Sequence, residues 1–567
     1  MSDLPVSPNN PQGKKELSME MRLLIAFALM FLVLFITPYI YKPTPAPKGT
    51  TAPATATQAV QLTKKPEAAP DEPLKQTVPG EIKAAAEQTF LIDTDLYKIQ
   101  FTNRGAVVKS WVLKKFVDSA GKPLELVNTA SFDKVPPPFA VSMKDDAVAK
   151  ELNYAAFVAK PAPDNLGIDF EFSDGKNYCH KSFRFSKTSY LSQLTTEVSQ
   201  NGQPVQHLIE WRGGFGDATV LNRAGQQHAL YYDLGQNKLV TKTAKDAKDG
   251  AITSTGNYSF AGQDDLFFAY VFLPKDNTST VVETVKDDVP AAPGAKEEPH
   301  VGTAVGGDAV NHFATFVGPK DIDILRKVDP KLQQLINWGF FGVVAKPLFL
   351  ALHWINDNVA HNYGWAIVLL TIGINLALFP LRLTSLKSQK KMQALQPHIQ
   401  VINAKYKGIS LRDPRKAEQN QEVMELYKKH GVNPMGGCLP MLIQLPILYA
   451  FYTVLGVTIE LRGAHWLWVT DLSRPETLAI HLLPVIMIVT QFVMQKMTPS
   501  PGMDPAQARM MQFMPLMFGF FFYNMSSGLV LYWLTGNLVG IVQQVSMNRM
   551  MPAPRIEPPP PPPKKKK

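Results

Sequence analysis

Two features are nearly absent from this 567-residue chain: cysteine, and charge inside its long apolar runs. The only cysteines, Cys179 and Cys438, have no Cys or His neighbours of the kind that forms a metal site, and neither a disulfide nor a metal is expected. Asp, Glu, Lys and Arg stand only near the ends of the apolar runs. Ion-coupled transporters usually need such groups at membrane depth, and enzymes need a catalytic cluster. The sequence therefore predicts no catalytic residue, no cofactor and no metal.

What the chain does have is a series of apolar runs separated by soluble segments. The first run, within residues 23–41, follows Lys14, Lys15 and Arg22 and is long enough to cross the hydrocarbon core as a helix. Its length argues against a cleaved signal peptide, whose hydrophobic region is shorter. The sequence predicts six transmembrane helices, because five further spans are expected at residues 363–381, 437–457, 478–494, 510–525 and 529–545.

The charges give these spans an orientation. Residues 381–435 hold eleven Lys and Arg against four Asp and Glu. Short loops with such an excess of positive charge stay in the cytoplasm. With six spans, the N-terminal residues 1–22 and the proline-rich basic tail 547–567 are then cytoplasmic as well. The large segment after the first span is expected on the outer side of the membrane.

That large segment divides into three parts. Residues 42–87 are rich in Pro and Ala and lack apolar periodicity, which indicates an extended linker. Residues 321–361 are apolar but interrupted by polar groups, as in amphipathic helices at a membrane surface. Between them, residues 88–320 are expected to form a large antiparallel sandwich. Its short β-type runs are at 90–101, 105–113, 190–198, 207–211 and 266–273.

The basic loop, residues 382–433, has the pattern of a helical hairpin. Apolar residues recur at spacings of three and four, and Gly408 with Asp413-Pro414 separates two helices. Its cations either contact ribosomal RNA, a targeting factor or an incoming chain, or they only enforce topology and solubility. Periodicity and charge leave both interpretations open. The cations expected to make contacts are Lys405, Lys407, Arg412, Arg415 and Lys416.

Uncharged polar residues are plentiful inside the expected spans. In most helix bundles such residues form hydrogen bonds between helices. The alternative is a partly hydrated groove that accepts polar pieces of another chain. The sequence leaves both open for Thr371, Asn375, Gln444, Thr453, Thr490, Gln491, Asn524, Thr535, Asn537 and Gln543.

Several motifs, in their order along the chain, carry a resemblance to a known family. They are Phe316-Val-Gly-Pro-Lys320, Lys346-Pro-Leu-Phe349, Leu395-Gln-Pro397, Asn433-Pro-Met-Gly-Gly-Cys-Leu-Pro440, Gln444-Leu-Pro446 and Gly528-Leu-Val-Leu-Tyr532. The chain closely resembles the YidC-type membrane protein insertases, in the Gram-negative form with a large periplasmic domain. The resemblance covers nearly the whole chain and is strongest in residues 316–545.

The resemblance implies a polytopic α-helical protein of the bacterial inner membrane, with six transmembrane helices, a large all-β periplasmic super-sandwich domain and a cytoplasmic helical hairpin. Residues 362–546 would form a five-helix core with a groove that is open to the cytoplasm and to lipid but closed on the outer side. Nascent membrane proteins, the Sec translocon, the ribosome, signal recognition components and membrane lipids are the expected partners, and a monomer is compatible with the sequence. The expected groove residues are Thr371, Asn375, Gln444, Tyr532 and Trp533.

Two positions depart from the family pattern. Family members commonly carry an arginine in the first core span, where this chain has Asn375 after a retained Thr371. Arg382 follows seven residues later on the same helical face and is expected at the cytoplasmic mouth of the groove. A pair of family tyrosines is Tyr532-Trp533 here, which keeps the aromatic surface and replaces one hydroxyl with an indole N–H. These departures argue against a mechanism that requires a buried arginine charge.

The resulting hypothesis is an insertase and chaperone that inserts, folds and helps assemble membrane proteins, alone or with the Sec translocon, without covalent chemistry. Polar side chains and water in a groove would lower the cost of moving a polar segment through hydrocarbon. The alternative is an envelope assembly scaffold whose periplasmic domain binds client proteins or sugars.

Overall fold

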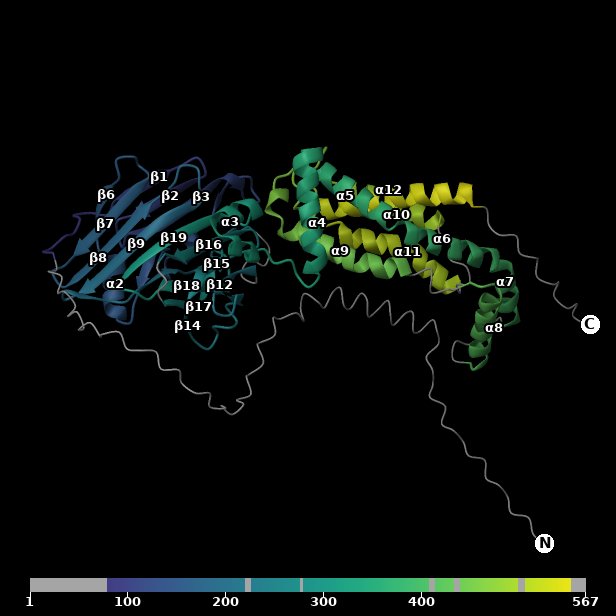
Figure 1. The fold of residues 1–567 in the computed structure, drawn as a ribbon, viewed down its shortest axis with the longest axis horizontal. Coiled ribbons are helices and arrows are strands. Elements are labelled where there is room, and N and C mark those ends of the chain that lie inside the picture. Colours follow the sequence, from purple (N-terminus) through teal and green to yellow (C-terminus); the bar gives the residue numbers. More distant parts are fainter. Residues whose placement is uncertain are drawn as a thin grey trace, which may run out of the picture.

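A computed structural model of the chain describes residues 79–219, 226–275, 279–406, 413–432, 439–497 and 505–551. A β-rich domain lies at one end of the long axis and a group of helices at the other, with α4 between them (Figure 1). The first expected span, residues 23–41, lies outside the described residues, as do most of the linker and residues 552–567 of the tail.

Three antiparallel sheets make up the β-rich domain. The first, in the order β1-β2-β3-β4, is formed by β1 (Thr89–Asp93), β2 (Tyr97–Thr102), β3 (Val107–Val117) and β4 (Pro123–Glu125). The third, in the order β14-β17-β18-β11-β5, is formed by β14 (Ile252–Gly256), β17 (Thr280–Pro290), β18 (Glu297–Gly306), β11 (Leu208–Trp211) and β5 (Ala140–Ser142).

The second sheet is the largest, and its strands run in the order β13-β12-β15-β16-β19-β9-β8-β7-β6, with β10 paired to β9. These strands are β6 (Val158–Pro161), β7 (Gly167–Ser173), β8 (Asn177–Arg184), β9 (Leu191–Gln200), β10 (Gln203–Pro204), β12 (His228–Asp233), β13 (Lys238–Lys242), β15 (Tyr258–Asp264), β16 (Phe268–Pro274) and β19 (Val310–Pro319).

Aromatic side chains join the large sheet to both smaller ones. Phe101 of β2 lies 4.8 Å from Phe183 of β8, and Trp211 of β11 stacks on Tyr270 of β16 at 4.6 Å, measured between ring centroids. Such pairs add to the stabilisation from buried apolar area. The strands expected from the sequence near residues 90–101, 105–113, 190–198, 207–211 and 266–273 are all present.

One detail of the predicted domain was wrong. The domain is not all-β, because a nine-residue helix, α2 (Asp146–Tyr154), follows β5, and a short 3-10 helix, η1 (Thr129–Ser131), precedes it. Asp145 caps α2 by accepting hydrogen bonds from the backbone N–H groups of Ala147 and Val148. Contacts of the domain also begin before residue 88, since Ile82 forms a backbone bridge with Ser173. Because prolines lie near Ile82, composition indicated a linker there and did not indicate this pairing.

A buried ion pair fixes the exit from the β domain. Lys320 Nζ, directly after β19, lies 2.9 Å from Asp264 Oδ2, and both side chains are 7% exposed. The chain continues through α3 (Ile322–Val328), the 3-10 helix η3 (Pro330–Leu335), α4 (Gly342–Ile355) and the π-helix η4 (Asn356–Ala360). These elements occupy most of the segment 321–361 that was expected to be amphipathic.

The remaining helices form the second half of the molecule. They are α5 (Tyr363–Ala377), α6 (Phe379–Ala394), α7 (Gln396–Lys405), α8 (Arg415–Lys429), α9 (Leu439–Val457), α10 (Leu482–Met497), α11 (Pro505–Phe522) and α12 (Ser527–Met550), with a 3-10 turn η6 (Ile459–Leu461) after α9. Helix α6 begins before the expected hairpin boundary at residue 382, because Pro380 lies in its first turn, where a missing N–H costs little.

Within the described residues, α12 is the single helix long and apolar enough to cross a bilayer by itself. A second candidate is the pair Gly342–Ala360 and Tyr363–Ala377, which is bent by 116°. Shorter apolar helices are Ile443–Val457, Leu482–Met497 and Phe513–Phe522. The topology with six spans therefore stays a prediction.

Helix α12 is the centre of the helical half. It packs against α5 and α10, and most of its residues are buried. Large apolar side chains on the surrounding helices stay exposed, such as Phe520, which is 88% exposed, and Val489, which is 56% exposed. Large exposed apolar side chains on neighbouring helices are typical of a surface that contacts lipid or another protein.

Candidate functional site

Tyr532 of α12 turns toward α9. Its side chain is 3% exposed, its ring stacks on Phe451 at 4.3 Å, and its hydroxyl accepts a hydrogen bond of 2.8 Å from Gln444 Nε2. The structure thus brings together Gln444 and Tyr532, two of the expected groove residues. Their polar atoms satisfy each other between two apolar helices.

Trp533 turns to another side of α12. Its indole N–H donates to Gln491 Oε1 of α10 at 3.3 Å, and its ring lies 5.0 Å from Phe522 of α11. Consecutive residues of a helix point about 100° apart. Tyr532 and Trp533 therefore do not form one aromatic surface, although the sequence grouped them.

Thr371 and Asn375 lie together on α5 and bond mainly to their own helix. The hydroxyl of Thr371 donates to the carbonyl of Ile367 at 2.6 Å, and Asn375 Nδ2 donates to the carbonyl of Thr371 at 2.8 Å. Such bonds satisfy a polar side chain inside an apolar helix. Thr371 is fully buried and Asn375 is half-buried. A link to α12 comes from Gln543 Nε2, which lies 3.4 Å from the Asn375 carbonyl.

The expected groove set omitted the polar residues of α12 that face α10 and α5. Asn537 Nδ2 lies 3.2 Å from Thr490 Oγ1 and 3.4 Å from the carbonyl of Met487. Asn537 follows Trp533 by four residues and therefore shares its helical face. That spacing, together with Gln543, was the sequence signal for a polar row along the last helix.

Arg382 points inward between α10 and α12. Its Nη2 atom lies 3.9 Å from the sulfur of Met494, and a Cβ atom built on Gly540 would lie 2.6 Å from that same nitrogen. The absence of a side chain at Gly540 gives the guanidinium its space. Next to it is a polar cavity of about 230 Å³, lined by Leu386, Gln389, Lys390, Gln393, Met497, Gln544 and Asn548.

Helices α7 and α8 pack together at the far end of the molecule from the β domain (Figure 1). Leu395, Ile399, Tyr427 and Val432 form their shared apolar cluster. The apolar spacing in the sequence indicated this pairing.

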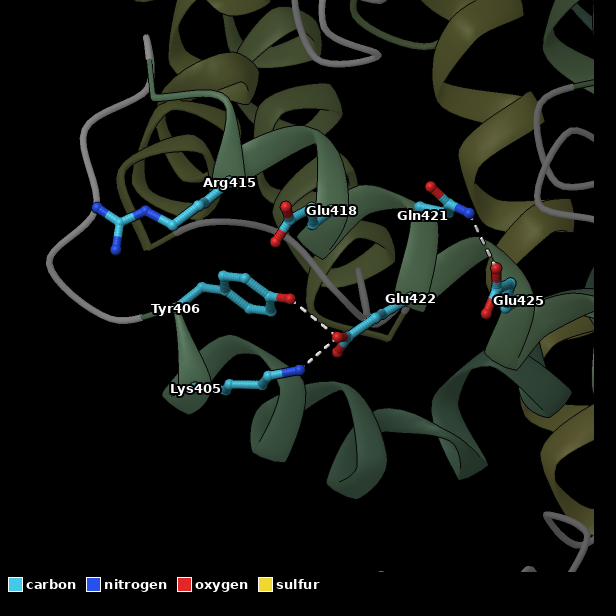
Figure 2. Close-up of a pocket in the computed structure, with 7 residues that line it drawn as sticks. All are labelled: Lys405, Tyr406, Arg415, Glu418, Gln421, Glu422 and Glu425. Carbon is cyan, nitrogen blue, oxygen red and sulfur yellow. Dashed lines mark hydrogen bonds and ion pairs between the residues drawn. The ribbon is translucent and has the colours of Figure 1, made fainter.

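A hollow of about 450 Å³ lies between the two helices, as Figure 2 shows, and it is lined by Lys405, Tyr406, Arg415, Glu418, Gln421, Glu422 and Glu425. Lys405 and the hydroxyl of Tyr406 both bind Glu422, and these contacts hold the pKa of the Glu422 carboxyl below its ordinary value. Arg415 pairs with Asp413 at 2.8 Å.

Two of the five expected contact cations, Lys405 and Arg415, are thus partnered by carboxylates. Exposed ion pairs of this kind are weak enough to exchange for another anion. Lys407 and Arg412 lie outside the described residues, as does the side chain of Lys416.

No group of three His, Cys, Asp or Glu side chains suited to a metal occurs in the described part of the chain. Cys179 is fully buried, and burial raises the pKa of its thiol to about 11. Helix α12 instead carries uncharged polar groups on several of its faces, held between apolar helices.

A large extramembrane β-rich domain joined to an apolar helical bundle defines a class of membrane protein, and comparison with known proteins identifies the family. The family description "YidC periplasmic domain" matches residues 89–351, and "60Kd inner membrane protein" matches residues 354–554.

Two relatives match nearly the whole chain. The membrane protein insertase YidC of Pelobacter propionicus is 33% identical over 552 residues, covering 94% of this chain and 100% of the relative. That of Geotalea daltonii is 33% identical over 564 residues, again covering 94% and 100%. A solved structure of an active YidC insertase covers 92% of this chain and 99% of its own, with 19% identity and a TM-score of 0.36. The chain belongs to the YidC family of membrane protein insertases.

Proposed function

We propose that this protein inserts membrane proteins into the bacterial inner membrane and helps them fold and assemble, through a groove lined by α5, α9, α10 and α12. The observation that carries this proposal is the set of uncharged polar side chains on several faces of α12, a largely buried apolar helix. Two of its members, Tyr532 and Asn537, are 3% and 5% exposed. In most bundles such groups bond between helices, and in a groove the same groups can exchange those bonds for bonds to a client.

The proposed mechanism is replacement of water by protein groups. A polar segment entering hydrocarbon loses the hydrogen-bond partners of its backbone, which costs several kcal/mol per group. Gln444, Tyr532, Asn375 and Trp533 would offer partners along the path, with Thr371 beside them. Arg382 would stand at the cytoplasmic mouth, where its charge attracts acidic segments. The client's apolar segment then enters lipid because of its own hydrophobicity, and no covalent step is needed.

The proposed topology has six spans, with residues 1–22, the hairpin 382–433 and the tail 547–567 in the cytoplasm and residues 42–361 in the periplasm. On the cytoplasmic side, the hairpin would contact the ribosome and signal recognition components through Lys405, Lys407, Arg412, Arg415 and Lys416. Insertion would proceed alone or beside the Sec translocon. The excess of basic residues between 381 and 435 supports this orientation.

An insertion assay with a defined client tests the function. Inner membrane vesicles depleted of this protein are supplied with a small single-span protein made by an in vitro ribosome system. We expect insertion to fall and to recover when the wild-type chain is restored. Undiminished insertion in depleted vesicles would contradict the insertase function.

The same assay ranks the groove residues. Trp533→Ala removes both an aromatic surface and the partner of Gln491, and insertion should fall by about tenfold, equivalent to ~1.4 kcal/mol. Asn375→Ala should cost about twofold or less, because the amide bonds to its own helix. Trp533→Phe is the matched control, which keeps the ring and loses the N–H. A larger loss for Asn375→Ala than for Trp533→Ala would refute the assignment.

A further inference from the structure

The loop between α9 and α10 carries a buried arginine, Arg462. Its side chain extends from the helical half of the molecule into the β domain. The Arg462 side chain is 4% exposed, and its ion-pair partner, Asp217, is fully buried. Arg462 Nη2 donates to Asp217 Oδ2 and to the carbonyl of Val117, the latter at 2.6 Å. Both partners belong to the β domain, which makes this a contact between the two halves of the molecule.

The β domain presents Asp217 in a prepared geometry. Thr219 donates to Asp217 Oδ1 through its backbone N–H at 2.8 Å and its hydroxyl at 2.6 Å, so that Oδ2 is left for Arg462. The preceding Gly216 has a φ of +92°, and a Cβ there would overlap the carboxylate of Asp265. Burial alone would raise the pKa of Asp217, but the Thr219 hydrogen bonds and the Arg462 charge outweigh it and lower that pKa.

Two phenyl rings cover the guanidinium. Its central carbon lies 5.6 Å from the ring centroid of Phe267 and 5.5 Å from that of Phe268. These distances suit cation–π attraction, which is strongest where water is excluded. Arg462 Nε and Nη1 have no hydrogen-bond partner among the described residues. The charge is therefore balanced mainly by Asp217, and removing one member would leave the other buried and unpaired.

The rest of this loop closes over the ends of α5 and α12. We call residues 458–476 the capping loop. Its Leu461, Val469 and Leu472 are at most 1% exposed. Asn362 Nδ2 donates to the carbonyl of His465 at 2.9 Å, and Gly528 N donates to the carbonyl of Leu472, also at 2.9 Å. One loop therefore touches the β domain on one side and two bundle helices on the other.

We infer that Arg462 is a positioning residue, through which the β domain holds the capping loop against the ends of α5 and α12. A second contact of the capping loop with the β domain, from Arg474 Nη1 to the carbonyl of Asp118 at 3.5 Å, leaves the domain attached when Arg462 is removed. The expected effect on insertion rests on the proposed function, whereas the docking contact itself does not.

Hydrogen exchange on the full-length protein in nanodiscs tests the docking. The amides of Trp466, Val469 and Leu472 are hydrogen-bonded within the capping loop. In Arg462→Met we expect these amides, and those of residues 217–219, to exchange at least tenfold faster. Arg184→Met is the control, because it breaks an exposed ion pair with Asp169 elsewhere on the β domain and should leave both segments unchanged.

A double-mutant cycle makes the result specific to the pair. Asp217→Asn should accelerate the same amides, and the variant with both substitutions should exchange no faster than the faster single variant, because no unpaired charge remains. If Arg462→Met does not fold, Arg462→Lys keeps the charge, cannot reach both Asp217 and Val117, and should show a smaller acceleration. Unchanged exchange in Arg462→Met, or additive effects in the cycle, would overturn the inference.

The insertion assay then separates the two claims. Slower insertion by Arg462→Met, by about fivefold, together with faster exchange supports a positioning role. Faster exchange with unchanged insertion overturns that role. If the wild-type chain does not restore insertion to depleted vesicles, the proposed function is contradicted. The hydrogen-exchange result would still support the docking contact.

Discussion

At the scale of single residues, Glu460 stands out beside the capping loop's arginine. It lies in the 3-10 turn η6 after α9, and its Oε1 atom is buried without a hydrogen-bond partner among the described residues. Burial raises the pKa of this carboxyl from 4.5 to about 8, and the negative charge of Asp321 adds to the effect. The folded protein therefore prefers Glu460 in its protonated form.

This preference predicts a pH dependence of stability. Because the pKa is higher in the folded state, the contribution of Glu460 is fully present below pH 4.5 and is lost as the pH rises through about 8. We expect the melting temperature of the full chain in detergent to fall less between pH 5 and pH 8.5 in Glu460→Gln than in the wild type. Glu425→Gln, on an exposed face of α8, should keep the wild-type difference. Equal pH profiles for Glu460→Gln and the wild type would rule out this assignment.

At the scale of elements, α5 is tightly packed in its first turn and has open space near its middle. Its first turn packs against the capping loop, where a Cβ built on Gly364 would overlap the Trp466 ring. Near its middle, Gly373 has no atom within 4 Å of the corresponding position. A tryptophan ring packed between two elements cannot move aside easily, unlike the end of a flexible chain.

The two glycines of α5 therefore give a matched pair of substitutions. Gly364→Ala should lower the free energy of unfolding by about 1–3 kcal/mol, because overpacking forces Trp466 or α5 to shift. Gly373→Ala should cause no loss, since alanine is the better helix former and the space is open. Thermal unfolding of both variants in detergent measures the difference. Equal stability of the two would mean that the capping loop does not pack on α5.

At the scale of the whole molecule, the two ends of the helical half differ in character. The end next to the β domain is closed by the capping loop, whose Leu461, Val469 and Leu472 are buried, and the far end carries the polar cavity beside Arg382 and the α7–α8 pair. This difference fits the proposed orientation, with the β domain in the periplasm and the hairpin in the cytoplasm.

Cysteine labelling tests that orientation. In a chain with Cys179→Ser and Cys438→Ser, we expect Leu467→Cys, at a position 62% exposed on the capping loop, to react with a membrane-impermeant maleimide in spheroplasts. Glu425→Cys, on α8, should react only after permeabilisation. Labelling of Glu425→Cys in intact spheroplasts would reverse the topology.

Much of the fold was predictable because its signals are local. The apolar spacing of Leu395 and Ile399 indicated the α7–α8 packing, and alternation with turn residues located β2, β9 and β16. Asp145, the N-cap of α2, was a sequence signal for this helix. The helix has only nine residues and lies among strands, so the signal was too short to predict it. Motif order was enough to place the chain in its family.

The expected groove residues stay a prediction as a site, and the structure shows how they are grouped. Gln444 and Tyr532 meet, whereas Trp533 joins Gln491, and Asn375 bonds along its own helix. A polar residue in an apolar helix must find a partner, but the sequence does not say on which neighbour. The direction of each side chain followed from the packing of α12 among α5, α9 and α10.

The sequence by itself determined several of the strands, the family and the polar content of α12, because periodicity, charge and motif spacing are properties of short stretches of chain. Only the tertiary structure decided that Arg462 meets Asp217, since these residues are 245 positions apart and each alone looks like an ordinary loop residue. This ion pair is energetically important because it is buried. A charge removed from water needs a partner, and the partner's identity depends on which surfaces the fold brings together.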